Sequence, residues 1–206
     1  MGGSTLCHAL VTLLILLQFS TYMNSCMATR PIHSINTNSE YIKTSCNATI
    51  YPGLCYRSLS VYATKIQTSP KQLARTALSV TLAAARSTSR LMSKLSRSRN
   101  LKPREAAAML DCVEEVSDSV DELQRSIREM GHTGTSNFEL QMSDIQTWVS
   151  AALTDEDTCM DGFDESPMNG HVKTTVRRHI TRVAHLTSNA LALINNYAST
   201  AKTTSP

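Results

Sequence analysis

Residues 103–131 read PREAAAMLDCVEEVSDSVDELQRSIREMG and form the clearest helical pattern in this chain of 206 residues. Pro103 occupies a favourable first helical position, and Gly131 is a natural stop. The stretch predicts a long amphipathic helix, which must bury one face against neighbouring helices. Its apolar side chains recur at the steps of three and four residues that define one helix face: Met109, Val113, Val116, Val120, Leu123, Ile127 and Met130.

Three further segments show helical periodicity. The first follows the capping box Ser69-Pro70-Lys71-Gln72, which has Pro at the first helical position. The second follows a similar box, Ser143-Asp144-Ile145-Gln146, and the third follows the break SPMNG at residues 166–170. No segment alternates convincingly with the period of a strand. Four such helices with short connections predict an all-α fold, an antiparallel up-down-up-down four-helix bundle over residues 69–198.

A shorter helical unit precedes the expected bundle. Residues 40–46, EYIKTSC, and residues 54–63, LCYRSLSVYA, flank the turn Tyr51-Pro52-Gly53. We expect an N-terminal helical hairpin over residues 40–68, so that the folded domain extends over residues 40–200. Residues 29–39 are polar and lack periodicity, and they are expected to form a flexible leader.

The N-terminus resembles a secretion signal. Residues 9–19, ALVTLLILLQF, are apolar except for Thr12 and Gln18. This run is too short to span a bilayer, which needs about 20 residues. We therefore expect residues 1–28 to be a secretory signal peptide that is cut after Ala28, although the segment before the apolar run contains no Lys or Arg. The alternative is a buried N-terminal helix.

Removal of this signal would leave an even number of cysteines: Cys46, Cys55, Cys112 and Cys159. In a secreted chain they indicate disulfides, with three possible pairings. Cys46 and Cys55 flank the Tyr51-Pro52-Gly53 turn and are the expected first pair, which leaves Cys112 with Cys159. A zinc site is disfavoured because the chain has no CxxC pair and no His at ligand spacing.

The sequence gives little support to catalysis. It contains no GxSxG, HExxH, P-loop or GxGxxG motif. The acids at residues 155–157 are expected to form a solvated helix end rather than a pair of catalytic carboxylates. We predict no enzyme, no cofactor and no metal. Three histidines share no ligand face and are expected to be solvated: His171, His179 and His185.

Charge is segregated along the chain, although its net value is only +3. Residues 86–104 hold seven Lys or Arg and no acid, residues 105–124 are strongly acidic, and residues 139–165 hold eight acids and no base. The basic run lacks interleaved aromatics, which argues against RNA binding. A solvated helix face or weak attraction to an acidic wall polysaccharide fits it better. The acidic patch would steer a basic partner protein to the second and third bundle helices.

Asn47-Ala48-Thr49 is a glycosylation sequon. A secreted chain makes Asn47 a candidate glycosylation site, but the neighbouring Cys46 can hinder its use.

Three motifs together resemble the plant invertase and pectin methylesterase inhibitor family. CNATIYPGLC at residues 46–55 is similar to the family's C-x-x-T-x-Y-P-x-x-C hairpin. LDCVEEVSDSVDEL at residues 110–123 and QTWVSAALTDEDTCMDGF at residues 146–163 are similar to its second and third bundle helices. Val116 and Ser119 depart from the Tyr and Ala that are usual there. The resemblance extends from residue 40 to about residue 197.

The resemblance implies a four-helix bundle with an N-terminal hairpin and two disulfides, paired first with second and third with fourth. It also implies an enzyme inhibitor that does no chemistry itself. One branch caps the pectin-binding cleft of pectin methylesterase in a noncovalent one-to-one complex, and the other blocks acid invertase. Residues 131–144, GHTGTSNFELQMSD, lack the Pro-Lys-Phe triplet of the invertase branch. We therefore expect a free-standing pectin methylesterase inhibitor in the apoplast and cell wall, with invertase inhibition as the alternative.

Contact positions also follow from the resemblance. Trp148 lies off the Ile145–Val149–Ala152 row and is either a partly exposed anchor of the kind enriched at interfaces or a bundle-edge residue. The Asp161 carboxylate gives a reason for pH-dependent binding, because its protonation would let enzyme carboxylates approach. The other residues that match contact or pH-sensing positions are Glu114, Gln146, Ser150 and Thr158.

Two readings from other classes remain open. A bundle that carries a small hydrophobic ligand is disfavoured, because large apolar residues are not in excess. A structural protein that binds the wall would retain pectin without inhibiting an enzyme.

Overall fold

The computed structural model describes residues 32–203 with the exception of residues 134–136, 165–167 and 169. The described residues from Ile35 onward form one compact unit. Within the described ranges every regular element is helical, which confirms the predicted all-α class. The expected signal peptide and its cut after Ala28 lie outside these ranges.

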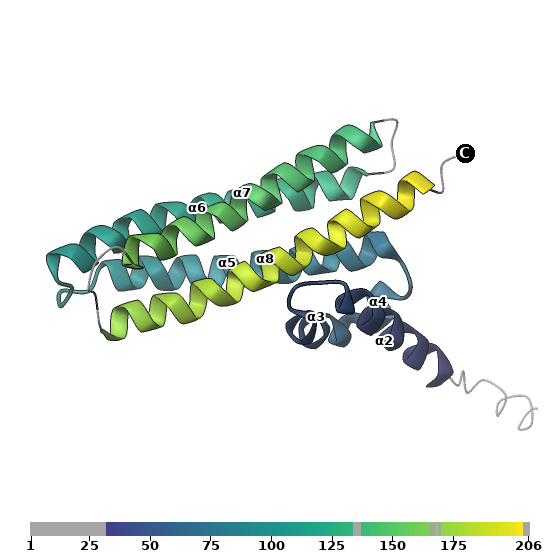
Figure 1. Cartoon of the computed structure of the whole chain (residues 1–206), viewed down its shortest axis with the longest axis horizontal. Coiled ribbons are helices and arrows are strands. Elements are labelled where there is room, and N and C mark those ends of the chain that lie inside the picture. Colours follow the sequence, from purple (N-terminus) through teal and green to yellow (C-terminus); the bar gives the residue numbers. More distant parts are fainter. Residues whose placement is uncertain (1–31, 134–136, 165–167, 169, 204–206) are drawn as a thin grey trace, which may run out of the picture. The chain divides into compact units, whose positions relative to one another are not determined.

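Four long helices form the predicted bundle: α5 (Pro70–Ser96), α6 (Pro103–His132), α7 (Phe138–Asp164) and α8 (His171–Thr203). Figure 1 shows them side by side along a common direction. Helix α6 packs on α5 and α7, and α8 packs on the same two helices from the other side. Short connections between consecutive helices make neighbours antiparallel.

Two of the expected helix starts are confirmed. The Ser69 hydroxyl accepts a hydrogen bond from the Gln72 backbone N–H at 3.3 Å, so it caps α5. At the start of α6 the Glu105 carboxylate accepts from the Lys102 backbone N–H at 3.0 Å. Both helices then begin at a proline, where the missing N–H costs no helical hydrogen bond.

Two other boundaries differ from the sequence prediction. Helix α7 begins at Phe138 and Ser143 lies inside it, because the half-buried Phe138 and the buried Met142 both pack on the core before the expected cap. Helix α6 continues past Gly131 to His132, since Met130 and Thr133 are both buried on either side of the glycine. In each case tertiary burial outweighs a local stop or start signal.

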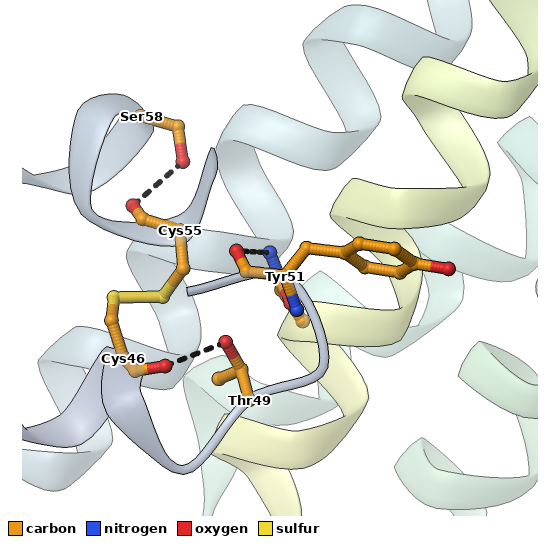
Figure 2. The surroundings of a disulfide bond; sticks show 6 residues. Cys46, Thr49, Tyr51, Cys55 and Ser58 are labelled. Atoms are coloured by element: carbon orange, nitrogen blue, oxygen red, sulfur yellow. Dashed lines mark hydrogen bonds between the residues drawn. A yellow bond between two sulfur atoms is a disulfide. The ribbon is translucent and has the colours of Figure 1, made fainter. Parts of the chain in front are cut away.

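The N-terminal hairpin consists of α2 (Ile32–Asn47), α3 (Pro52–Leu59), the 3-10 turn η1 (Ser60–Tyr62) and α4 (Ala63–Ile66). Helix α2 begins within the segment expected as a flexible leader. The Cys46–Cys55 and Cys112–Cys159 disulfides are both present, with Cα–Cα distances of 5.5 and 4.2 Å. The predicted pairing is therefore confirmed, and the first bridge joins the end of α2 to α3 (Figure 2).

The hairpin turn is held against α8 by one side chain. The Tyr51 backbone N–H donates to Asn189 Oδ1, and Asn189 Nδ2 donates to the Tyr51 carbonyl, each at 3.0 Å. The Tyr51 ring stacks on His185 with a centroid distance of 3.6 Å, and Figure 2 shows the ring extending over the α8 ribbon. Asn189 is only 3% exposed, so its two hydrogen bonds to Tyr51 lie away from solvent.

We expect Asn189→Leu to lower the free energy of unfolding by about 2 kcal/mol, because it leaves the Tyr51 N–H and carbonyl without their partner. The matched control is Asn195→Leu on the same helix, whose side chain accepts an exposed hydrogen bond from Gln146. That control should change stability by less than about 0.5 kcal/mol. Urea unfolding of both variants measures the difference, and equal stabilities would show that the Asn189 contacts do not hold the turn.

A buried polar layer divides the bundle core. One apolar cluster includes the hairpin and residues such as Ala152 and Ala190, and the other surrounds the Cys112–Cys159 bridge. On α5, α6 and α7 one buried polar residue lies between the two clusters in sequence: Thr88, Ser119 and Glu156. Helix α8 adds the buried Thr187, one turn beyond Val183 of the first cluster. Three of these are joined by hydrogen bonds, since Ser119 and Thr187 both donate to Glu156 Oε1, at 2.8 and 2.9 Å.

Candidate interaction site

The charge segregation seen in the sequence follows the bundle helices. Helices α5 and α8 contain no Asp or Glu, and both carry several Lys and Arg. Helix α7 contains seven Asp or Glu and no Lys or Arg, and α6 is acidic overall. Because α6 packs on α7 and α5 packs on α8, one half of the bundle is acidic and the other is basic.

The acidic half contains a cluster of carboxylates at the junction of α6 and α7. Asp155 of α7 interacts electrostatically with three acids of α6: Glu115, Asp118 and Glu122. Glu115 in turn interacts with Asp118, Glu114 and Asp111. We call these six residues the acidic face. The row on α6 is visible in the sequence as Asp111, Glu115, Asp118 and Glu122, spaced by four, three and four residues, but only helix packing adds Asp155.

Asp155 is the member of the acidic face whose charge changes near pH 6. Partial burial raises its pKa to about 6, and repulsion from the three carboxylates of α6 adds to the effect. Burial and like-charged neighbours also raise the pKa of Glu115. The acidic face therefore loses negative charge in mildly acidic solution, at a pH where an ordinary surface Asp stays ionised.

Two of the expected contact residues lie at or beside the acidic face. Glu114 is exposed on α6 and belongs to it. Trp148 is half-buried and precedes Asp155 by seven residues, so the two side chains share one side of α7. This position makes Trp148 a bundle-edge residue with part of its indole accessible.

The other four expected contact residues are on α7 but are not brought together at one point. Gln146 is half-buried and donates to Asn195 Oδ1 of α8 at 2.8 Å, so it lies on the α8 side of the helix. Thr158 is exposed, and its hydroxyl donates to the Thr154 carbonyl at 2.9 Å. Ser150 and Asp161 are also exposed. These residues line the outer surface of α7 along most of its length rather than a single pocket.

The prediction that the acids at residues 155–157 form a solvated helix end is wrong for the middle residue, Glu156. Glu156 is 0% exposed and accepts hydrogen bonds from Ser119 and Thr187, whereas Asp157 is exposed. Burial raises the pKa of Glu156 to about 8, and the two hydroxyl hydrogen bonds oppose that rise. Glu156 therefore sits at the core position of α7 between Ala152 and Cys159. The spacing of four residues from Ala152 and three residues to Cys159 is the feature of the sequence that indicates a buried position for Glu156.

The histidines are also less uniform than expected. His171 is exposed, but His179 and His185 are half-buried, and His185 stacks on Tyr51. The expectation of solvated side chains is wrong for His185, since the hairpin that covers it is distant in sequence. Within the described residues no group of three or more His, Cys, Asp or Glu is arranged to hold a metal ion.

The acceptor residue of the sequon, Asn47, is exposed, but the Thr49 that completes the sequon is buried. Asn47 is the last residue of α2 and is exposed. Thr49 is only 8% exposed, and its hydroxyl donates to the Cys46 carbonyl at 2.8 Å (Figure 2). Glycosylation of Asn47 stays a prediction, and this geometry favours modification before the hairpin folds.

Comparison with known proteins identifies the family. Residues 40–193 match the sequence profile described as Plant invertase/pectin methylesterase inhibitor. The chain belongs to the plant invertase/pectin methylesterase inhibitor family. This is a family of enzyme inhibitors, in agreement with the resemblance carried by the three motifs. The matched range includes both disulfides, the whole acidic face and all six expected contact residues.

Relatives within the inhibitor family share much of the chain. Pectinesterase inhibitor 10 of Arabidopsis thaliana is 53% identical over 171 residues, which are 82% of this chain but only 54% of that protein. Pectinesterase inhibitor 11 of the same plant is 49% identical over 162 residues, 77% of this chain and 80% of that protein. The chain thus spans about half the length of the first relative and most of the second.

A solved structure supports the fold of this family member. The crystal structure of a mutant form of a pectin methylesterase inhibitor from Arabidopsis superposes with a TM-score of 0.59 at 24% identity, covering 75% of this chain and 95% of that one. At this identity the likeness concerns the helical fold alone. Among the described helices, none is long and apolar enough to cross a membrane.

Proposed function

We propose that this protein is a secreted inhibitor of pectin methylesterase that acts in the apoplast and cell wall and does no chemistry itself. The observation that carries the proposal is its family membership, together with relatives named pectinesterase inhibitors that share about half of their aligned residues with it. The missing Pro-Lys-Phe triplet favours the esterase over acid invertase as the target. The inhibitor domain corresponds to residues 40–200, and the signal peptide to residues 1–28.

We infer that the target enzyme binds noncovalently and one to one over α6 and the outer side of α7. The acidic face gives this surface a strong negative field, which makes association sensitive to salt and, through Asp155, to pH. Trp148 supplies accessible aromatic area beside the carboxylates, as at many interface hot spots. The polar contacts are assigned to the half-buried Gln146 and to the exposed Glu114, Ser150, Thr158 and Asp161.

The first test mixes the purified, oxidised protein with a plant pectin methylesterase and, separately, with a plant acid invertase at about pH 5 to 7. Inhibition of the esterase alone supports the proposal, and inhibition of the invertase alone overturns it. Trp148→Ala should weaken esterase inhibition about tenfold, the typical effect of removing an interface aromatic. Val61→Ala, which removes an exposed apolar side chain from the 3-10 turn η1 of the hairpin, is the matched control and should leave inhibition unchanged.

Inhibition is expected to strengthen as the pH falls through about 6 and Asp155 becomes protonated. Docking of a protein over the acidic face buries Asp155 further, which penalises its ionised form and couples binding to proton uptake. The coupling is at most about tenfold in affinity per pH unit, since each unit corresponds to 1.4 kcal/mol.

Asp155→Asn should flatten this pH dependence and bind the esterase at pH 7 as tightly as the unmodified protein does at pH 5. Asp161→Asn provides the comparison, because Asp161 is the exposed carboxylate to which the family resemblance assigns pH sensing. Inhibition constants measured across this range decide between them. An unchanged slope in Asp155→Asn together with a flat profile in Asp161→Asn would assign the pH dependence to Asp161.

A further inference from the structure

An open groove lies between the hairpin turn and α8, on the basic half of the bundle. Its volume is about 890 Å³, and its walls are residues 50–54 and Arg57 of the hairpin and one face of α8 from Thr174 to His185. The two walls are more than 100 residues apart in sequence. The groove therefore exists only because the hairpin packs on α8.

The lining of this groove is strongly basic. It includes Arg57 from α3 and three arginines from α8, and none of its residues is acidic. Arg177 is already paired, since its Nη2 lies 2.6 Å from Asp164 Oδ1. Within the described part of the chain, no ion pair involves Arg57, Arg178 or Arg182, and all three are exposed. Three guanidinium groups are thus available to a ligand.

The walls of the groove are held in place before any ligand arrives. The Cys46–Cys55 bridge and the Tyr51–Asn189 hydrogen bonds fix the hairpin turn against α8. The Arg57 guanidinium packs over the turn, 3.3 Å from the position that a Cβ on Gly53 would take. Arg178 and Arg182 are one turn apart on the same helix face. Such preorganisation lowers the entropic cost of binding.

The chemistry of these groups selects the class of ligand. Guanidinium groups bind planar carboxylates through two parallel hydrogen bonds. The groove is open, so it suits a chain that runs along it better than an enclosed small molecule. Nucleic acid fits less well, because the only aromatic residue of the lining beside His185 is Tyr51, and these two rings stack on each other instead of facing bases.

We propose that this groove binds a linear polycarboxylate polysaccharide, namely pectin from which the methyl esters have been removed. The arginines of the groove indicate a polycarboxylate ligand, whereas the choice of pectin as that ligand rests on the proposed function. Ester hydrolysis converts each neutral methyl ester to a carboxylate, so the arginines distinguish the product of the esterase from its substrate. The groove would retain the inhibitor where demethylation has already occurred.

The test compares binding of the purified, oxidised protein to polygalacturonate and to highly methylesterified pectin, by affinity electrophoresis in calcium-free buffer of low ionic strength. The variant Arg57→Gln/Arg178→Gln/Arg182→Gln removes three positive charges from the groove. Its matched control, Arg75→Gln/Arg90→Gln/Lys94→Gln, removes three exposed charges from α5. We expect the groove variant to bind polygalacturonate at least tenfold more weakly and the control to lose less than threefold.

Three results would overturn the proposal: equal losses in the two variants, equal binding of the esterified polymer, or binding of polyglutamate as tight as that of polygalacturonate. The last result would assign the groove to an acidic peptide. If the triple variant does not fold, as judged by circular dichroism, Arg178→Gln alone should weaken binding about threefold. Esterase inhibition is measured separately and should survive in the groove variant. A protein that binds polygalacturonate but inhibits no esterase would refute the proposed function and leave the groove assignment standing.

Discussion

Replacement of Cys112 and Cys159 by alanine is expected to lower the free energy of unfolding by about 4 kcal/mol, the largest loss that we predict for this protein. The bridge closes a loop of 47 residues between α6 and α7. In the chain-entropy model, its removal lets the unfolded chain regain the freedom of that loop. Both cysteines are buried beside Val116 and Phe163, so loss of the sulfur atoms also leaves a gap in the second core cluster.

Thermal unfolding measures this effect. A domain of this size loses about 2–4 °C in Tm for each kcal/mol, so the double variant should melt roughly 8–16 °C lower. The comparison is Cys46→Ala/Cys55→Ala, which opens a separation of only nine residues and should cost less, about 3 kcal/mol. An unaltered Tm of the Cys112/Cys159 variant would mean that helix packing alone holds this end of the bundle.

The protein is expected to lose stability between about pH 6.5 and pH 8, and Glu156→Gln is expected to remove most of that loss. The native pKa of Glu156 is about 8, raised from an ordinary value of 4.5. Between these values the unfolded chain is ionised at Glu156 while the native protein keeps the proton. Unfolding then releases a proton, so stability is highest below the ordinary pKa and falls as the pH rises towards 8.

The expected size of this loss is about 1.4 kcal/mol for each pH unit, or about 2 kcal/mol between pH 6.5 and pH 8. The Asp155 pKa, raised to about 6, acts in the same direction only at lower pH, so this window isolates Glu156. Glutamine keeps an oxygen that can accept from Ser119 and Thr187 but does not ionise. It adds an unpartnered amide N–H, so the variant is expected to be less stable than the unmodified protein at pH 5.

Asp157→Asn is the matched control for Glu156→Gln, because it neutralises the next residue, which is exposed. Urea unfolding at several pH values should give parallel curves for this control and the unmodified protein. As the pH rises, the free energy of unfolding of Glu156→Gln should increase relative to that of the unmodified protein. If all three proteins show the same slope, the buried carboxylate is not the group that titrates.

The polar layer explains why one departure from the family pattern is tolerated. Ser119 departs from the alanine that the family resemblance leads us to expect, and its hydroxyl donates to the Glu156 carboxyl. A buried carboxyl group costs less when such donors surround it. Glu156 Oε2 has no hydrogen-bond partner among the described residues, so the layer is only partly satisfied.

The amino-acid sequence by itself determined the helical class, the bundle and both disulfides. Apolar steps of three and four residues, such as Met109–Val113–Val116–Val120–Leu123, require one buried helix face. Short connections then leave an antiparallel bundle as the simplest way to bury four such faces. Local rules also placed the starts at Pro70 and Pro103, because capping depends on residues within one turn. Cys46 and Cys55 flank a turn, which indicated that they form the first disulfide. Cys112 and Cys159 were then left to form the second.

Tertiary structure alone decided the properties that depend on residues from different helices. The burial of Glu156, the raised pKa of Asp155 and the groove that joins Arg57 to Arg178 and Arg182 each need side chains that are 30 or more residues apart. Helix periodicity shows that a residue faces the core or the surface, but it does not show which neighbours it meets there. Charge, burial and preorganisation at a site depend on those neighbours, so they follow from packing and not from local sequence.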